Sequence, residues 1–147
     1  MSSLQIVAVV VVGFVVFLSV LRMIVGRVAA AGKAEIEKHY RKEDIVLMEP
    51  GANSFGVESG GAMQLRGNGG LVLTSRVLHF FMLVPRREIK IALGDIREVK
   101  TVRSHLGKNV AQPLLHVRWN AGETEDAIAW WVRDVEAWKR ELSNLRT

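Results

Sequence analysis

The stretch RGNGGLVLTSRVLHFFMLVPRR, residues 66–87, decides the fold class of this chain. A glycine-rich loop cradles a phosphate group only where a helix follows it, because free backbone N–H groups and the helix dipole then converge on the anion. Here aliphatic and aromatic residues in strand-like alternation follow the glycines, so a phosphate-binding loop is excluded. We predict instead that Gly67, Gly69 and Gly70 form a turn or bulge between strands.

The alternation continues to residue 132 and predicts about seven short strands, which is typical of an antiparallel β-sandwich or barrel. The strand segments lie within residues 71–82 and at 87–93, 95–102, 113–119 and 126–132, with weaker candidates at 44–49 and 61–66. The positions expected to share the core face are Leu71, Leu73, Leu78, Phe80, Met82, Ile89, Ile91, Ile96, Val102, Leu115, Val117, Trp119, Ile128, Trp130 and Val132.

The spacing of the apolar residues changes near the C-terminus. Four apolar residues fall at intervals of three and four, which is one stripe of an α-helix, and Asp134 is placed to cap its N-terminus. The stripe consists of Val135, Trp138, Leu142 and Leu145. We expect this helix to pack on an open end or edge of the sheet, because a single apolar stripe must be buried.

The N-terminus carries an apolar run without charge from Leu4 to Leu21. With the next few residues it reaches the roughly 20 residues that span a bilayer. A cleaved signal peptide is the alternative, but no basic residue precedes the run, and Arg22 and Arg27 separate it from the small residues 29–32. We therefore predict an uncleaved anchor. The expected organisation is a transmembrane helix at 1–26, a basic helical stalk at 27–43 and a single domain at 44–147.

The net charge of +5 is concentrated behind this run, since residues 1–42 contribute six basic and two acidic side chains. The positive-inside rule then predicts that the C-terminal domain lies on the cytoplasmic side of an inner or plasma membrane. Residues 32–45 are expected to form a solvated helix with Glu37 and Arg41 paired one turn apart, or to be held by anionic lipid, or both. The chain has no cysteine, which excludes disulfides and thiolate chemistry.

Seven short strands followed by one amphipathic helix with a tryptophan in its stripe resemble the pleckstrin-homology (PH)-like superfold. Within it, residues 67–80 followed by 87–99 look like the GRAM branch and the bacterial PH-like domains. Trp138 stands where that fold usually carries its helix tryptophan. The resemblance covers residues 44–145 and implies a mainly β domain with a C-terminal helix. PH domains that bind phosphoinositides carry a Lys/Arg cluster near their first loop, whereas this chain has only Arg66 there.

Residues 86–108 hold seven basic and three acidic side chains. They are interpreted either as solvated strand faces or as a basic face turned toward anionic lipid or an acidic partner. The candidate contacts are Arg86, Arg87, Lys90, Lys100, Arg103 and Lys108. Binding of nucleic acid is not expected, because the rest of the domain offsets this charge and the aromatic residues fit core positions.

The remaining polar residues show no catalytic pattern. His79 and His116 fall on the outer strand faces and are expected to be surface residues, and Ser59 lacks the G-x-S-x-G setting of a nucleophile. Trp131 is expected outside the core, as a partner contact, at the lipid headgroups or under a loop. Residues 104–108 and 129–134 receive no functional assignment. The sequence favours a non-catalytic, membrane-tethered binding module without metal or cofactor; an enzyme with an unrecognised site is the alternative.

Overall fold

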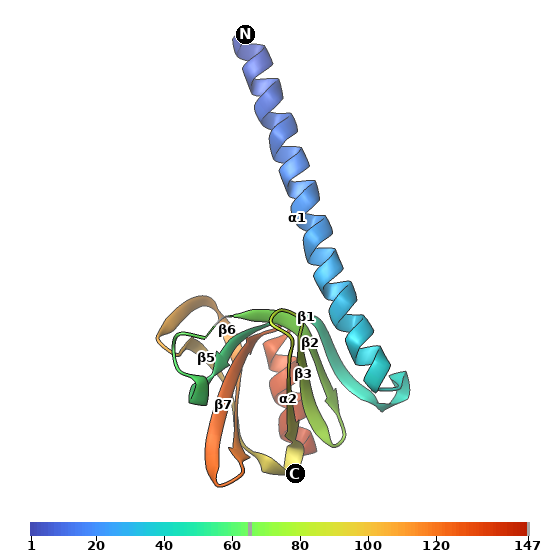
Figure 1. Cartoon of the computed structure of the whole chain (residues 1–147), viewed down its shortest axis with the longest axis vertical. Coiled ribbons are helices and arrows are strands. Elements are labelled where there is room, and N and C mark those ends of the chain that lie inside the picture. Colours follow the sequence, from blue (N-terminus) through green and yellow to red (C-terminus); the bar gives the residue numbers. More distant parts are fainter. Residues whose placement is uncertain (65, 147) are drawn as a thin grey trace.

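The computed structural model describes residues 1–64 and 66–146. A long helix, α1, leads into a seven-stranded antiparallel sheet that is followed by a short helix, α2 (Figure 1). The helices are α1 (Ser3–His39) and α2 (Val135–Leu145), and the strands are β1 (Ile45–Val57), β2 (Gly67–Thr74), β3 (Val77–Met82), β4 (Arg87–Ala92), β5 (Ile96–His105), β6 (Lys108–Ala121) and β7 (Thr124–Trp131). Single 3₁₀ turns lie at η1 (Lys42–Asp44), η2 (Glu58–Gly60) and η3 (Leu93–Asp95).

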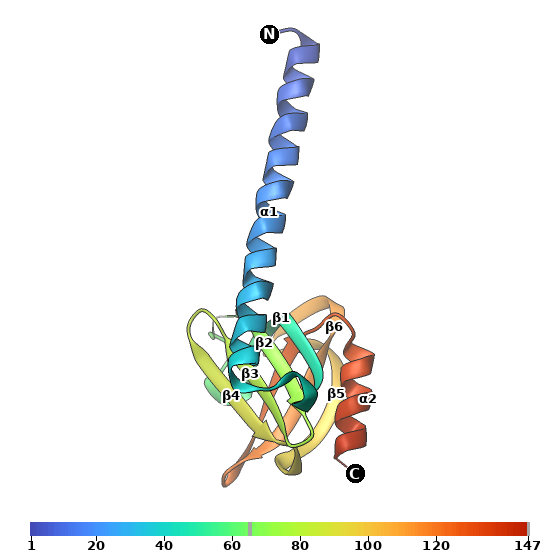
Figure 2. The same ribbon diagram turned by 90° about the vertical axis from the view of Figure 1, so that its right-hand side faces the viewer.

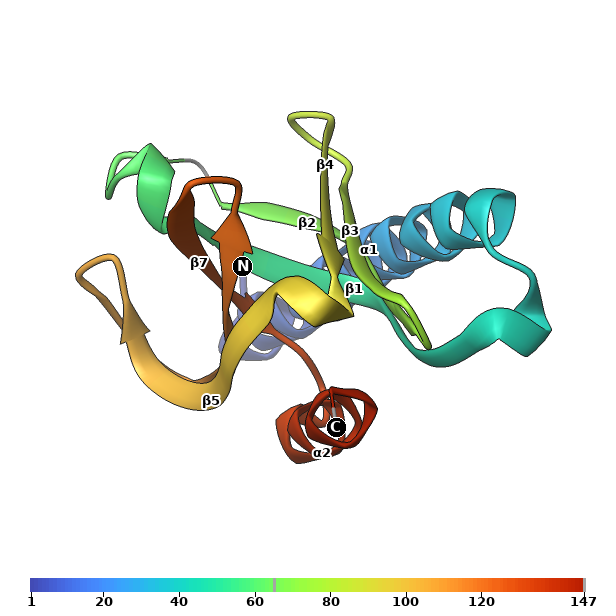
Figure 3. The ribbon, with the colours of Figure 1, turned by 90° about the horizontal axis from the view of Figure 1, so that it is seen from below.

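The strand order is β4-β3-β2-β1-β7-β6-β5, so β4 and β5 form the two edges. Among the described residues these edges do not pair, and the sheet is curved but not closed into a barrel. Figure 3 shows the curved sheet from below, with α2 seen nearly end-on and packed beside β5. The predicted mainly β fold with a C-terminal helix is therefore confirmed at this level.

The core lies between the concave face of the sheet and α2. With two exceptions, the residues predicted to share the core face belong to one buried cluster, which Trp138 and Leu142 complete. Ile89 is half-buried at the margin of this cluster. Val102 was predicted wrongly: an irregularity between Ile96 and Glu98 inserts one residue into β5, which reverses the alternation and turns Val102 to the opposite face.

Helix α2 forms as the apolar stripe predicts. The side chain of Asp134 accepts a hydrogen bond from the Ala137 N–H at 2.9 Å, which caps the first turn. Trp138 and Leu142 are buried against the sheet, with Val135 and Leu145 at the margin of the cluster.

The prediction that the glycines lie between strands is wrong, because Gly67, Gly69 and Gly70 are part of β2. A Cβ on Gly69 would lie 1.9 Å from the Phe81 carbonyl oxygen of β3, so only glycine fits this close approach. The register irregularity is on the neighbouring strand, between Glu49 and Ala52 of β1. A strand, not a helix, follows the glycines, which agrees with the exclusion of a phosphate-binding loop.

The boundaries of β1 also differ from the prediction. The strand continues from Ile45 through Pro50 to Val57, whereas the sequence indicated only residues 44–49, because proline is unusual inside a strand and is tolerated here at the irregularity. The weaker strand at residues 61–66 is not formed at residues 61–64 or at Arg66, and Leu65 lies outside the described residues.

Helix α1 is continuous for 37 residues and is long and apolar enough to cross a bilayer. Its apolar window is fully exposed, whereas its last turns pack on β1, β2 and β3 (Figure 2). The helix ends at His39, so the expected Glu37–Arg41 pair does not form within it: Glu37 pairs with Lys33, and Arg41 pairs with Asp44. The second half of the predicted stalk therefore packs on the sheet through Gly32, Ile36 and Tyr40.

Candidate functional site

The junction between α1 and the sheet is built on two glycines in close contact. A Cβ on Gly32 of α1 would lie 2.0 Å from the Pro50 carbonyl oxygen, and a Cβ on Gly70 of β2 would lie 2.6 Å from the Gly32 carbonyl oxygen. One turn later, Ile36 is completely buried in a cluster with Val72 and Phe81. The helix backbone thus lies directly on the sheet, and the glycines of β2 provide the flat surface that it needs.

A chain of hydrogen-bonded polar side chains links the C-terminal end of α1 to β3 and β4. The Tyr40 hydroxyl lies 2.8 Å from Nδ1 of His79, and Nε2 of His79 lies 3.2 Å from a carboxylate oxygen of Glu88 on β4. Burial lowers the pKa of His79 below its ordinary value of 6.5, although the Glu88 carboxylate acts in the opposite direction. The prediction that His79 is a surface residue is wrong, because α1 covers the outer face of β3.

An ion pair holds α1 to the turn between β3 and β4. Nη2 of Arg86 lies 2.9 Å from Oε1 of Glu35, and Nζ of Lys38 lies 3.0 Å from the same oxygen. Hydrogen bonds from Lys38 and Arg86 lower the pKa of the Glu35 carboxyl. Arg86, predicted as a lipid or partner contact, is therefore in part a structural residue.

The turns between β3 and β4 and between β5 and β6 lie at the end of the sheet from which the N-terminal part of α1 projects (Figures 1 and 2). We call this the helix-exit end. The candidate contacts at these turns are Arg86 and Arg87 on the first and Arg103 and Lys108 on the second. Because α1 is packed on the sheet, the direction of these turns relative to the apolar part of α1 is fixed.

Loop residues after β1 connect the two turns. Gln64 lines a cavity of about 160 Å³ together with Arg87, and its carbonyl oxygen accepts a hydrogen bond from Nζ of Lys108 at 3.4 Å. Arg66 lies over the ring of Phe55 at 4.2 Å and lines a neighbouring cavity with Val28 of α1. Arg87 and Lys108 thus lie next to the loop that contains Arg66, although the sequence had set Arg66 apart from the basic stretch.

The other predicted contacts are not part of this group. Lys90 and Lys100 lie within β4 and β5, the two opposite edges of the sheet. Nζ of Lys100 pairs with Glu98 at 3.0 Å, and Arg103 donates a hydrogen bond to the Ala111 carbonyl. The structure thus separates the six candidates into those at the helix-exit end and two strand residues whose charges lie elsewhere.

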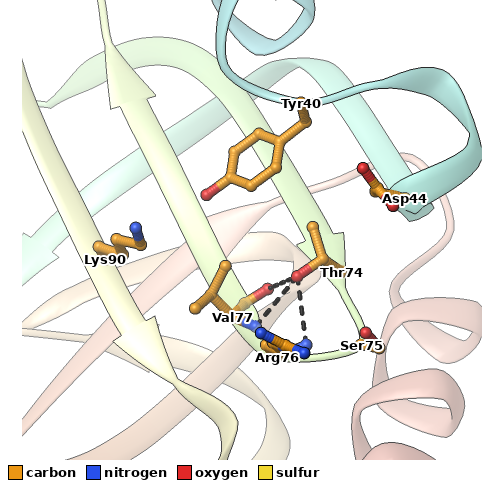
Figure 4. A pocket seen from close by; sticks show the side chains of 7 residues that line it. All are labelled: Tyr40, Asp44, Thr74, Ser75, Arg76, Val77 and Lys90. Atoms are coloured by element: carbon orange, nitrogen blue, oxygen red, sulfur yellow. Dashed lines mark hydrogen bonds between the residues drawn. The ribbon is translucent and has the colours of Figure 1, made fainter.

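Lys90 lines a cavity of about 480 Å³ near the end of α1. Figure 4 shows its wall, in which the Thr74 hydroxyl is engaged with the backbone of the β2–β3 turn, Arg76 lies in that turn and Lys90 lies on β4. The hydrogen bonds of Thr74 are those of a tight turn. No nucleophile–base pair is formed among the side chains that line this cavity.

Trp131 is half-buried and lies outside the main core, as predicted. Its indole N–H donates a hydrogen bond to Oε1 of Gln112 at 2.9 Å. The side chain lines a mainly apolar cavity of about 410 Å³ together with Ile24 and Val28 of α1 and with Arg133. Trp131 therefore lies beside the segment of α1 that emerges from the apolar run.

His116 is also buried, contrary to the prediction of a surface residue. Burial, followed by the nearby His105, lowers its pKa. The 3₁₀ turn η2 brings Glu58 over the outer face of β6, 3.8 Å from His116. Strand alternation identifies an outer face but cannot indicate which distant segment covers it.

No known protein family matches the chain, and no curated protein sequence is similar to it.

Proposed function

We propose that this protein is a single-pass membrane protein whose PH/GRAM-like domain is held in a fixed orientation at the membrane surface and binds anionic lipid non-catalytically. The apolar part of α1 is its anchor. The PH-like assignment is supported by the seven antiparallel strands and by the closing helix with its buried Trp138. The binding surface consists of Arg66, Arg87, Arg103 and Lys108 at the helix-exit end.

One observation carries this proposal: α1 packs on the sheet through Gly32 and Ile36 instead of leading into a flexible linker. Seven residues separate exposed Val25 from Gly32, and a rise of about 1.5 Å per residue makes this roughly 10 Å. The headgroup layer outside the hydrocarbon core is about 5–8 Å thick, and the Debye length is about 8 Å at physiological salt. The basic turns therefore lie within electrostatic reach of the lipid surface.

The strength of this contact need not be high. Each basic residue near an anionic surface contributes about 1 kcal/mol, and the anchor already provides a high local concentration. A few basic residues held in a fixed orientation are then enough to keep the helix-exit end of the domain against the bilayer. Trp131 and Arg133, at the cavity beside α1, extend the same surface toward the interface.

The test is hydrogen exchange of the full chain in nanodiscs of neutral or anionic lipid. We expect the β3–β4 and β5–β6 turns to be protected only in anionic discs, and protection to fall as salt is raised. The double variant Arg87→Glu/Lys108→Glu should lose this protection. Arg86 is left unchanged because its reversal would also break the pair with Glu35.

The matched control is Arg76→Glu, in the β2–β3 turn, which is at the other end of β2 and β3 from the helix-exit end. It should retain the protection. Equal exchange of the wild-type turns in neutral and anionic discs at low salt would reject the lipid surface, and a protein partner at the same end would then be the alternative.

A further inference from the structure

We propose that Glu58, His105 and His116 form a binding site for a divalent transition-metal ion of the Zn²⁺ class. The three side chains come from η2, β5 and β6, and one ligand atom of each lies within 4.8 Å of the others. The two imidazole rings are 5.5 Å apart at their centroids and are inclined by 71°. This proposal does not rest on the proposed function, although His105 shares the β5–β6 hairpin with Arg103 and Lys108.

His105 is oriented by the backbone. Its Nε2 lies 2.7 Å from the Gly56 carbonyl oxygen, an acceptor only, so Nε2 must carry the proton. In the neutral ring Nδ1 then keeps its lone pair, which is the arrangement that metal-binding histidines adopt when the second nitrogen donates to a carbonyl. The hairpin turn that follows His105 is formed by Leu106 and Gly107, both at positive φ.

His116 is buried, and one of its ring nitrogens lacks a hydrogen-bond partner among the described residues. Its Nδ1 has no hydrogen-bond partner among the described residues, and its Nε2 lies 3.8 Å from Oε1 of Glu58, beyond hydrogen-bond distance. A buried polar group without partners is unfavourable, and it needs an explanation such as an ion. A metal ion bound to this imidazole and to the carboxylate of Glu58 would give His116 a partner.

Glu58 is fixed before any ion binds. Nη2 of Arg118 lies 3.0 and 3.1 Å from its two carboxylate oxygens. The adjacent Ser59 donates hydrogen bonds to Asp126 from its backbone N–H at 3.0 Å and from its hydroxyl at 2.6 Å. Arg118 therefore orients the carboxylate as outer partners of metal ligands do, but its charge also moderates the affinity for a cation.

The ligand set determines the class of metal. Two imidazoles and one carboxylate suit Zn²⁺ and neighbouring transition ions, whereas Mg²⁺ and Ca²⁺ prefer sets made only of oxygen. Three protein ligands leave a fourth position for water or another ligand. Because the ligands join the end of β1 to the β5–β6 hairpin, bound metal should stabilise the sheet domain.

The test is calorimetric titration of the full, untagged chain in detergent micelles with Zn²⁺, together with thermal unfolding. We expect saturable 1:1 binding, a rise in Tm with Zn²⁺, and no comparable binding of Mg²⁺. Glu58→Gln should weaken binding by about 10-fold or more. His105→Ala should abolish it and remove the Zn²⁺-dependent rise in Tm.

The matched control is His39→Ala, which removes an exposed histidine of α1 and should leave binding unchanged. Circular dichroism would identify a variant that fails to fold. Glu58→Gln is the variant least prone to misfolding, because both buried histidine rings remain in place. Absence of saturable Zn²⁺ binding by the wild type would overturn the proposal. Full affinity in folded Glu58→Gln or His105→Ala would do the same.

Discussion

Gly32 shows how a single residue determines the position of a helix on a sheet. A methyl group at this position would lie 2.0 Å from the Pro50 carbonyl oxygen and 3.1 Å from the backbone nitrogen of Gly70. Neither backbone atom can move away independently of its strand. Any side chain at residue 32 must therefore displace α1 from β1 and β2.

We predict that Gly32→Ala loosens the last turns of α1, with amide exchange of residues 33–40 accelerated about 10-fold or more, equivalent to roughly 1.4 kcal/mol. Alanine by itself favours helix by about 1 kcal/mol over glycine, so faster exchange would report lost docking. Gly26→Ala is the matched control, because nothing lies within 4 Å of its added methyl group. Unchanged exchange in Gly32→Ala would contradict the close packing.

Trp138 is the corresponding residue on the other side of the sheet, 3% exposed and in contact with the main core. We predict that Trp138→Ala lowers the free energy of unfolding by about 3–5 kcal/mol, because a large cavity remains. Urea denaturation in micelles would measure this loss. Exposed Arg140→Ala on the same helix should change it by no more than about 0.5 kcal/mol. A small effect at Trp138 would show that α2 is only loosely attached.

Helix α1 combines two functions that the sequence had assigned to separate segments. Its first part is exposed and apolar, whereas Ile36 and Tyr40 cover the outer face of β2 and β3. A fragment that starts at the predicted domain boundary, residue 44, would lack Ile36 and would therefore expose Val72 and Phe81. A useful soluble fragment must begin before Gly32.

This helix–sheet junction should weaken in mild acid. Burial lowers the pKa of His79, so below its ordinary value of 6.5 the released state takes up a proton that the docked state does not. Docking is thus at full strength above about pH 6.5 and is lost progressively as the pH falls toward the lowered pKa. The titratable and charged groups that face the His79 ring are Tyr40, Glu88, Lys90 and His39. None of them is a buried base, so we assign the pH dependence to His79.

We predict that amide exchange of residues 33–40 is faster at pH 5.5 than at pH 7.5, after correction for the intrinsic rates. His79→Gln, which keeps polar atoms but does not titrate, should remove most of this difference. The local readout separates the effect from protonation of His116 on the other half of the sheet. Persistence of the full pH dependence in His79→Gln would assign it to another group.

At the scale of the whole molecule, α1 is packed on the sheet, so the orientation of the proposed anchor determines on which side of the membrane the basic turns would lie. The charge excess behind the apolar run predicts that the C-terminal domain is cytoplasmic. A reporter fused after residue 147 should be active if it requires the cytoplasm and silent if it requires the periplasm or exterior. The reverse result, or a mature N-terminus near residue 32, would contradict both the orientation and the uncleaved anchor.

The sequence by itself determined the features that depend on local periodicity. Alternation placed Phe80, Val117 and Trp130 in the core, and the 3–4 spacing identified α2 with its cap at Asp134. A long uncharged apolar run similarly identified the first part of α1. These signals are short-range, because each follows from how one strand or helix presents its own side chains.

Only the tertiary structure decided what covers the outer faces. A one-residue irregularity reversed the alternation before Val102, and α1 buried His79 although 39 residues separate it from Tyr40. In the same way, Glu58 meets His105 and His116 only because η2, which follows β1, lies close to β5 and β6 in the folded chain. The glycines of β2 are also explained only by the tertiary structure, because the backbone atoms that leave no room for a side chain there belong to β3 and α1. Contacts between segments distant in the chain leave no periodic pattern in either segment, and only their folding onto one another brings the candidate site together.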